Sequence, residues 1–344
     1  MVFKDEHSIR PPRGAGGGSN AALAYFEAWD MPTRKEFVRL NELAANVPEP
    51  DKKIQPELRA ALSEHSGYVD SLLKAASIEH CDWGFGWSAG WGMLLPHLGW
   101  TRMSCRVLAA DARRCMEDGS AIAAIERVRA MVRLGQHASE GPVLISSLVG
   151  IAIMQRGVTL TNELLDHHAF TPAQARMLLR VFEGIPREDL CHTRASIRKE
   201  REITVAWLLE KCRSAEPGLD YSRLMREMGM GASEWFVAGM TREQFERDLA
   251  RAERYYHEID RAWAGELPQV RLSELEEQLM ELQHGLIACQ MTPSVGRAQK
   301  TVANLEKTLN KLERRLKKIA EPEQSEGVQE SQGTKAEGPQ AKTE

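Results

Sequence analysis

Apolar residues recur every three or four positions along most of this chain, and this spacing predicts helices between residues 19 and 320. The segment from Pro96 to Asp166 contains three long helices, separated at Asp118-Gly119 and at Glu140-Gly141-Pro142. Antiparallel helices of about 20 residues joined by tight turns are the unit of helical-repeat proteins. The sequence therefore predicts an all-α fold, arranged as an irregular helical-repeat-like array of stacked antiparallel helix pairs.

The residues at the predicted helix starts support this interpretation. Ser19 or Asn20 can cap the first helix, and Thr33 with Glu36 forms a capping box for the second. Thr171-Pro172 marks the start of a further helix, because Pro is favoured in the first turn. These local signals place several helix starts without any knowledge of the tertiary structure.

The C-terminal region has the most regular pattern. Thr292-Pro293 supplies a cap and a first-turn proline, so we expect the helix over residues 272–288 to turn back before the last helix. Alternating steps of three and four are typical of a coiled coil, which predicts an antiparallel coiled-coil-like hairpin. In the last helix these steps connect Val295, Ala298, Val302, Leu305, Leu309, Leu312, Leu316 and Ile319.

Charge favours the same hairpin. Residues 272–283 carry four Glu and no base, whereas residues 297–318 carry eight Lys or Arg against Glu306 and Glu313. An acidic helix beside a basic helix is stabilising. The last helix is longer than its expected partner, so one end would overhang or contact another chain.

Four segments follow from these patterns. Residues 1–18 form a Pro/Gly-rich leader that we expect to be disordered, and residues 19–240 form the helical-repeat-like domain. Residues 241–320 hold the C-terminal helices, including the hairpin. Residues 321–344 form an acidic tail, expected to be disordered, with six Glu and two Lys.

Composition adds limits on location and partners. The tail has a net charge of −4, the same as the whole chain, so the remainder is neutral and gives no general attraction for nucleic acid. Six cysteines without a CxxC pair indicate reduced thiols. The most apolar run, residues 143–154, is too short to span a bilayer. We therefore expect a cytoplasmic protein without a transmembrane segment.

Residues 80–100 hold the densest group of chemically capable side chains. A segment with four Gly in residues 82–92 predicts a loop rich in aromatic residues. Such a loop could form a ligand pocket, or the indoles could pin a corner between helices with Asp82 as a cap. The candidate pocket residues are His80, Asp82, Trp83, Trp87, Trp91 and His97.

Elsewhere the sequence lacks signatures of catalysis. Cys81, His97, Cys105 and Cys115 lack the close ligand pairs of a zinc site, so we expect no metal. Ser146 and Ser147 lie in an apolar helix without a nucleophile elbow. No catalytic residue and no cofactor is predicted, which favours a protein that is not an enzyme.

Two functional hypotheses remain. The first is a non-enzymatic scaffold or protein-protein interaction protein that uses its C-terminal helices to bind a protein partner or a second copy. The second is a small-ligand-binding protein or enzyme built on the pocket around His80 to Trp100. Nucleic-acid binding by the basic helix is not expected, because the hairpin would use both its seam and its charge.

Part of the sequence also resembles an uncharacterised bacterial family of all-helical, repeat-like proteins. The residues that carry the resemblance are His80 to Trp83, Leu94 to Leu98 and Ile145 to Ala152. Asn20 to Leu23 and the helix at Thr292-Pro293 resemble its two ends, so the likeness covers most of residues 20–320. The resemblance implies a helical-repeat-like fold and no known activity. Family members are often exported or membrane-anchored through an N-terminal segment, which gives an alternative location if such a segment is missing here.

Overall fold

The computed structural model describes residues 19–45, 53–84, 95–141, 143–214 and 286–321, with isolated helical positions between residues 243 and 274. Within these residues the chain forms helices and turns and no strand, which confirms the all-α prediction. The helices in chain order are α1 (Ala21–Trp29), α2 (Arg34–Ala45), α3 (Pro56–Glu64), α4 (Ser66–Ser77), α5 (Pro96–Glu117), α6 (Ala121–Ala138), α7 (Leu144–His167), α8 (Pro172–Glu183), the 3₁₀ turn η2 (Leu190–His192), α9 (Thr193–Ser214) and α14 (Leu286–Ala320).

The predicted helix starts have the expected local bonds. The Asn20 side chain accepts a hydrogen bond from the Ala22 N–H at 3.0 Å, and so caps α1. The Glu36 carboxylate accepts from the backbone N–H of Thr33 at 2.7 Å, and a second capping box opens α8 at Thr171. Gly119 has a positive φ of 73°, which suits the tight turn between α5 and α6. These features depend on short stretches of sequence, which is why the sequence predicts them.

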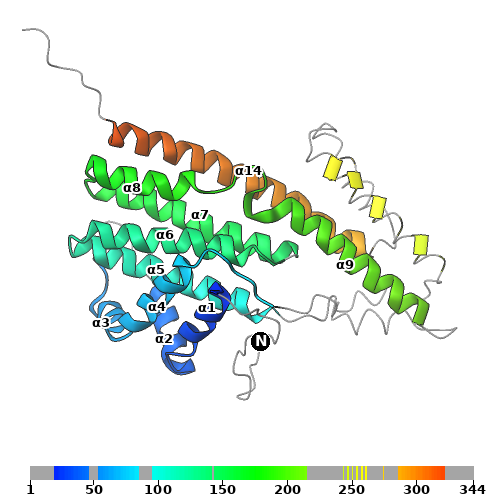
Figure 1. Cartoon of the computed structure of the whole chain (residues 1–344), viewed down its shortest axis with the longest axis horizontal. Coiled ribbons are helices and arrows are strands. Elements are labelled where there is room, and N and C mark those ends of the chain that lie inside the picture. Colours follow the sequence, from blue (N-terminus) through cyan, green and yellow to red (C-terminus); the bar gives the residue numbers. More distant parts are fainter. Residues whose placement is uncertain are drawn as a thin grey trace, which may run out of the picture.

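The long helices α5, α6 and α7 form the centre of the molecule, with α1–α4 on one side and α8 with α14 on the other (Figure 1). Two glycines let α6 and α7 approach closely. A Cβ added to Gly150 would lie 2.6 Å from the carbonyl oxygen of Gly135, which no side chain could tolerate without a shift of the backbone. The contact between these two helices therefore depends on the absence of side chains at this point.

The last helix differs from the predicted hairpin. α14 is continuous from Leu286 to Ala320, so the expectation that Thr292-Pro293 begins the last helix is wrong. A proline inside a helix costs about 3 kcal/mol through its missing N–H and its clash with the preceding turn. The packing of the apolar face further along α14 stabilises the helix and overrides this local signal. Apart from Glu274 and residues 286–288, the predicted acidic arm lies outside the described residues.

The leucine face of α14 packs on the body of the protein. Leu305, Leu309, Leu312 and Leu316 are fully buried and belong to the same hydrophobic core as the helices α5–α8. The helices that α14 contacts there are α8 and α7 (Figure 1). The seam that predicted a coiled coil is thus buried, at these positions, against the body of the protein. The repeat-like stacking stays a prediction.

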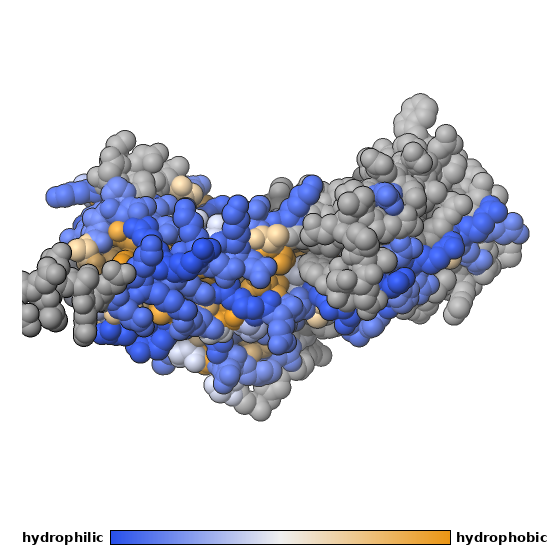
Figure 2. Space-filling view, turned by 90° about the horizontal axis from the view of Figure 1, so that it is seen from above, coloured by the Kyte–Doolittle hydropathy of each residue, from blue (hydrophilic) through white to orange (hydrophobic). Residues whose placement is uncertain are grey.

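α7 is the helix in the described part of the chain that is long and apolar enough to cross a membrane. Two thirds of its most apolar window, 67%, is buried inside the protein. Hydrophilic residues cover most of the described surface on the α14 side (Figure 2). This burial is what the position of α7 between α6 and α14 requires, because an apolar helix at the centre of a bundle contacts protein on several sides.

Candidate functional site

The predicted pocket region contains a compact group of rings, which we call the aromatic cluster. Trp83 is 2% exposed and stacks parallel to Trp29, with ring centroids 5.9 Å apart and an interplanar angle of 2°. The ring of His97 lies 4.6 Å from the ring of Trp83. The cluster comprises Tyr25, Phe26, Trp29, Phe37, Tyr68, Trp83, His97, Trp100 and His137.

Polar atoms at the edges of the cluster have partners within the protein. The indole N–H of Trp29 donates to the Ser104 hydroxyl at 2.9 Å, and the Tyr68 hydroxyl shares that Ser104 oxygen at 2.8 Å. The indole N–H of Trp83 donates to the carbonyl of His137 at 2.8 Å. Buried Trp and Tyr side chains need such partners. These indole and hydroxyl groups therefore contribute to the packing of α1, α4, α5 and α6.

Two buried histidines belong to the cluster and are neutral at physiological pH. Burial lowers the pKa of His97 to about 3. Burial also lowers the pKa of His137 to about 4, and the Arg133 charge adds to this effect. The Nδ1 of His137 lies 3.1 Å from the Tyr25 hydroxyl. A proton-transfer group for catalysis near neutral pH needs a pKa near 7, which neither imidazole has.

The segment before Trp83 is held by the first helix. The amide group of Asn20 bonds the backbone of Asp82 in both directions, at 2.9 Å and 3.0 Å, and the Ala21 N–H donates to the carbonyl of His80 at 2.9 Å. The Asp82 carboxylate accepts from the Gly84 N–H at 2.8 Å. His80 and Asp82 are exposed, while Trp83 points into the core. The sequence identified Asn20 as a cap and did not show that it also binds this loop.

The structure thus gives the position of four of the six predicted pocket residues. Trp83 and His97 are together in the core, and His80 and Asp82 are on the surface beside them. Trp87 and Trp91 lie outside the described residues. A ligand pocket formed by all six stays a prediction.

A pair of charged residues lies at the edge of this region and was not identified from the sequence. The Nε2 of His192 is 3.4 Å from the Glu140 carboxylate. This contact raises the pKa of His192, and it lowers the pKa of Glu140, to which His137 and His80 add smaller effects. The two residues are 52 positions apart and follow no motif, so only the fold brings them together.

The backbone at His192 is unusual. Cys191 and His192 have positive φ values of 56° and 51°, in the left-handed region that residues with a Cβ rarely adopt. The Asp189 carboxylate accepts hydrogen bonds from the N–H groups of Arg194 and Ala195, at 2.8 Å and 3.0 Å, and so caps α9. The turn places the buried Cys191 thiol against Met154 and leaves His192 half-exposed beside Glu140.

A partly buried carboxylate in α9 caps the central helix α7. The Glu200 side chain accepts a hydrogen bond from the Leu144 N–H, and burial raises the pKa of Glu200. The hydroxyls of Ser147 and Ser196 are 2.7 Å apart in the same contact. A helix N-terminus favours a carboxylate through its dipole and its N–H groups. Glu200 thus has a structural partner that explains its position.

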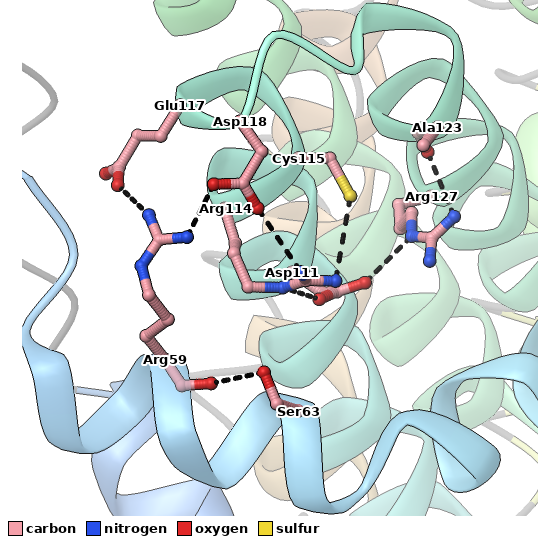
Figure 3. A network of polar contacts seen from close by, with 9 residues as sticks. All are labelled: Arg59, Ser63, Asp111, Arg114, Cys115, Glu117, Asp118, Ala123 and Arg127. Atoms are coloured by element: carbon pink, nitrogen blue, oxygen red, sulfur yellow. Dashed lines mark hydrogen bonds and ion pairs between the residues drawn. The ribbon is translucent and has the colours of Figure 1, made fainter.

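A second charged group connects α3, α5 and α6 (Figure 3). Asp111 is 1% exposed on its side chain and lies between the guanidinium groups of Arg114 and Arg127, at 2.7 Å and 2.8 Å. Arg59 from α3 binds Glu117 and Asp118 at the end of α5, at 2.5 Å and 2.6 Å. A buried carboxylate held by two cations is satisfied. Each of these charged side chains has a partner of opposite charge, and the network joins the three helices.

Cysteines and metal ligands add no reactive group in the described part of the chain. Burial raises the pKa of Cys105 and of Cys191 to about 12, so both are thiols rather than nucleophilic thiolates. Among the described residues no three His, Cys, Asp or Glu side chains are grouped as metal ligands would be.

The inner face of α14 is fixed to the body by ion pairs as well as leucines. Arg315 binds Asp166 at 2.8 Å, Lys317 approaches Glu183 at 3.6 Å, and Glu313 pairs with Arg187. In addition, an Arg176 guanidinium N–H donates to the carbonyl of Ala320 at 2.9 Å. These contacts orient the helix, so its opposite side faces away from the body.

The opposite side of α14 carries a row of cations that we call the basic face. All five side chains are exposed, and none of them forms an ion pair with a described residue. Their steps of seven, four, three and four residues place them on one line, opposite the buried leucines. At 1.5 Å per residue the row is about 27 Å long. The basic face consists of Lys300, Lys307, Lys311, Arg314 and Lys318.

Comparisons with protein-family models, with curated proteins and with solved structures found no match for this chain in any of the three.

Proposed function

We propose that this protein is a non-enzymatic helical scaffold that binds a protein partner through the basic face of α14. The observation that carries the proposal is the division of α14 into two faces. Its leucines are buried in the core, whereas Lys307, Lys311 and Arg314 are exposed in one line without an acidic partner among the described residues. Stacked antiparallel helix pairs would form the rigid support for this face.

The chemistry of the described core supports a role other than catalysis. His97 and His137 are neutral in the core, and the buried carboxylate of Asp111 is held by two arginines. Groups used in acid-base or nucleophilic catalysis need access to a substrate and a suitable pKa. The scaffold hypothesis needs neither. We place the scaffold in the cytoplasm, where buried thiols such as Cys105 stay reduced.

The expected partner is an acidic polypeptide. The basic face is one residue wide, and the exposed carboxylate of Glu306 lies on the same helix beside it. This carboxylate would repel the phosphates of a nucleic acid. A single row of acidic side chains, in contrast, can pair with the five cations along one line. Each exposed pair contributes about 0.2 to 1 kcal/mol, so binding requires several pairs and weakens with salt.

The alternative function, a small-ligand pocket around His80 to Trp100, is still a prediction. Its support in the described residues is the closeness of Trp83 and His97. The same stacking is expected of two rings in a core.

Charge reversal on the basic face tests the proposal. The triple variant Lys307→Glu, Lys311→Glu and Arg314→Glu is compared with a control in which three other exposed lysines, Lys35, Lys53 and Lys74, are changed to Glu. Both variants change the charge by the same amount. Fluorescence anisotropy measures binding of a labelled helical peptide with Glu at steps of three and four, and of a 30-base-pair DNA duplex.

The expected result is salt-sensitive binding of the peptide by the natural chain and by the control, with binding at least tenfold weaker in the basic-face variant. Equal peptide binding by all three proteins would contradict the proposal. Tighter binding of the duplex than of the peptide, lost in the same variant, would replace the protein partner with nucleic acid. Circular dichroism and thermal unfolding confirm that all three proteins are folded alike.

A further inference from the structure

The residues that directly follow α14 are acidic, whereas its basic face carries only positive charges. Residues 321–334 contain Glu321, Glu323, Glu326 and Glu330 and no Lys or Arg. The basic face contains five cations and no carboxylate on the same line. We propose that residues 323–330 of the same chain bind along the basic face, antiparallel to α14, and compete there with the partner. The competition rests on the proposed function, whereas the contact itself does not.

The distances along the chain allow this contact. α14 ends at Ala320, with the Glu321 N–H still bonded to the carbonyl of Lys317 at 2.9 Å. Pro322 comes next and cannot continue the helix hydrogen bonds. Lys307 lies 13 residues before Ala320, which is about 20 Å along a helix. An extended chain spans about 3.3 Å per residue, so six or seven residues cover this distance.

Covalent connection favours this segment over a separate molecule of the same charge. A short flexible connection gives an effective concentration in the millimolar range. Weak ion pairs of the surface type are therefore more populated within one chain than between two separate molecules at low concentration. The contact is therefore expected at low salt and is expected to be lost at high salt, where the Debye length falls to about 3 Å.

The other acidic segment of this chain does not reach the same lysines as a helix. Residues 272–283 precede α14, which runs without a break from Leu286. A helix of twelve residues is about 18 Å long. After a reversal near residue 285 it would extend beside α14 to about residue 298, before Lys300. With α14 continuous through Pro293, an acidic helix over residues 272–283 would overlap little with the basic face, whereas residues 323–330 are within reach of it.

Zero-length cross-linking of the full chain tests the contact. A carbodiimide joins a lysine amine to a carboxylate only when the two are in direct contact, and mass spectrometry identifies the pair. We expect cross-links within one chain from Lys307, Lys311 or Lys318 to Glu323, Glu326 or Glu330 at low salt, and none at 1 M salt. The variant with Glu323→Gln, Glu326→Gln and Glu330→Gln should lack them. A control outside this segment, Glu337→Gln with Glu344→Gln, should retain them.

The absence of these cross-links, while other lysines of the chain react with neighbouring carboxylates, would overturn the proposal. Their appearance only in a covalent dimer would overturn it as well and would assign the contact to a second copy. Competition is measured with the acidic peptide, whose Kd should fall at least threefold in the triple Gln variant. Cross-links with an unchanged peptide Kd would overturn the competition. Cross-links without peptide binding by any variant would contradict the proposed function alone.

Discussion

The aromatic cluster and the basic face are both dense groups of chemically similar side chains, and the sequence predicted a candidate pocket near the first and a basic helix at the second. In the aromatic cluster Trp83 and Trp29 stack in the core and their indole N–H groups are bonded to the protein. On α14, Leu312 is buried while its neighbour Lys311 is exposed. The two groups thus differ in exposure, and the exposure of each depends on what its segment packs against.

The largest loss of stability is expected for a substitution of Trp83. Replacement of Trp83 with Ala should lower the free energy of unfolding by about 3 to 5 kcal/mol, because a large buried ring is lost. The neighbouring Asp82→Ala change removes a turn cap and should cost about 1 kcal/mol. Urea unfolding followed by circular dichroism gives both values. If Trp83→Ala costs no more than Asp82→Ala, the ring lines an open site rather than the core.

The two faces of α14 provide the next comparison. Leu312→Ala should lower the free energy of unfolding by about 2 to 5 kcal/mol, since Leu312 is 0% exposed. The adjacent Lys311→Ala should change it by less than about 0.5 kcal/mol, as is usual for surface positions. Chemical unfolding of the two single variants measures this difference. Similar small effects at both positions would mean that α14 does not depend on the core, and the distinction between its faces would fail.

The close contact of α6 and α7 tests how rigid the body is. Gly150→Ala should destabilise the protein by about 1 to 3 kcal/mol, because the new methyl group meets the carbonyl of Gly135. The control is Gly99→Ala in α5, where no atom lies within 4 Å of the added Cβ. That change should stabilise the helix by about 0.5 to 1 kcal/mol. Thermal unfolding of both variants decides the point, and a Gly150→Ala protein as stable as the natural one would show that the helices can move apart.

The smallest expected effect on stability comes from the ion pair of Glu140 and His192. The pKa of His192 is raised in the folded state, so its contribution is complete below the ordinary pKa of 6.5 and is lost as the pH rises through the folded value. The pKa of Glu140 is lowered, so its contribution is present above the ordinary 4.5 and is lost as the pH falls through the folded value. The pair should therefore stabilise most between about pH 5 and 6.

Both side chains are nearly half-exposed, at 48% and 43%, so solvent screening limits their contribution to less than about 1 kcal/mol. The difference in Tm between the natural chain and His192→Asn, measured from pH 4.5 to 8.5, reports this contribution. We expect a maximum near pH 5 to 6 and a decline toward pH 8. A difference that is constant over this range would exclude the pair as a source of pH dependence.

Local signals predicted much of the fold. The capping residues Asn20, Thr33 and Thr171 have the bonds that their types and spacing indicate, and the breaks at Gly119 and Gly141 separate the three long helices. A cap depends on three or four neighbouring residues, so the sequence carries the information completely. The same reasoning failed at Pro293, because a local preference worth about 3 kcal/mol was outweighed by the packing of a distant leucine face.

The candidate sites were predicted less completely. The sequence grouped His80, Asp82, Trp83 and His97 as candidate pocket residues. In the structure Trp83 and His97 are buried in the core, whereas His80 and Asp82 are exposed. Glu140 and His192 had no shared pattern, since they lie in two connections that the fold brings together. Pairs of this kind cannot be found by spacing along one element.

By itself the sequence determined that the described part of the chain is helical, where many of its helices begin, and that the last helix combines an apolar seam with an excess of basic residues. These properties follow from periodicity and from short-range hydrogen bonds. The tertiary structure alone decided that the apolar seam of α14 is buried against the body and that a line of basic residues faces outward. The leucines of α14 pack on α7 and α8, so Lys307, Lys311 and Arg314 face outward. The physical reason is that apolar burial is non-directional, and many apolar surfaces can satisfy the same periodic pattern.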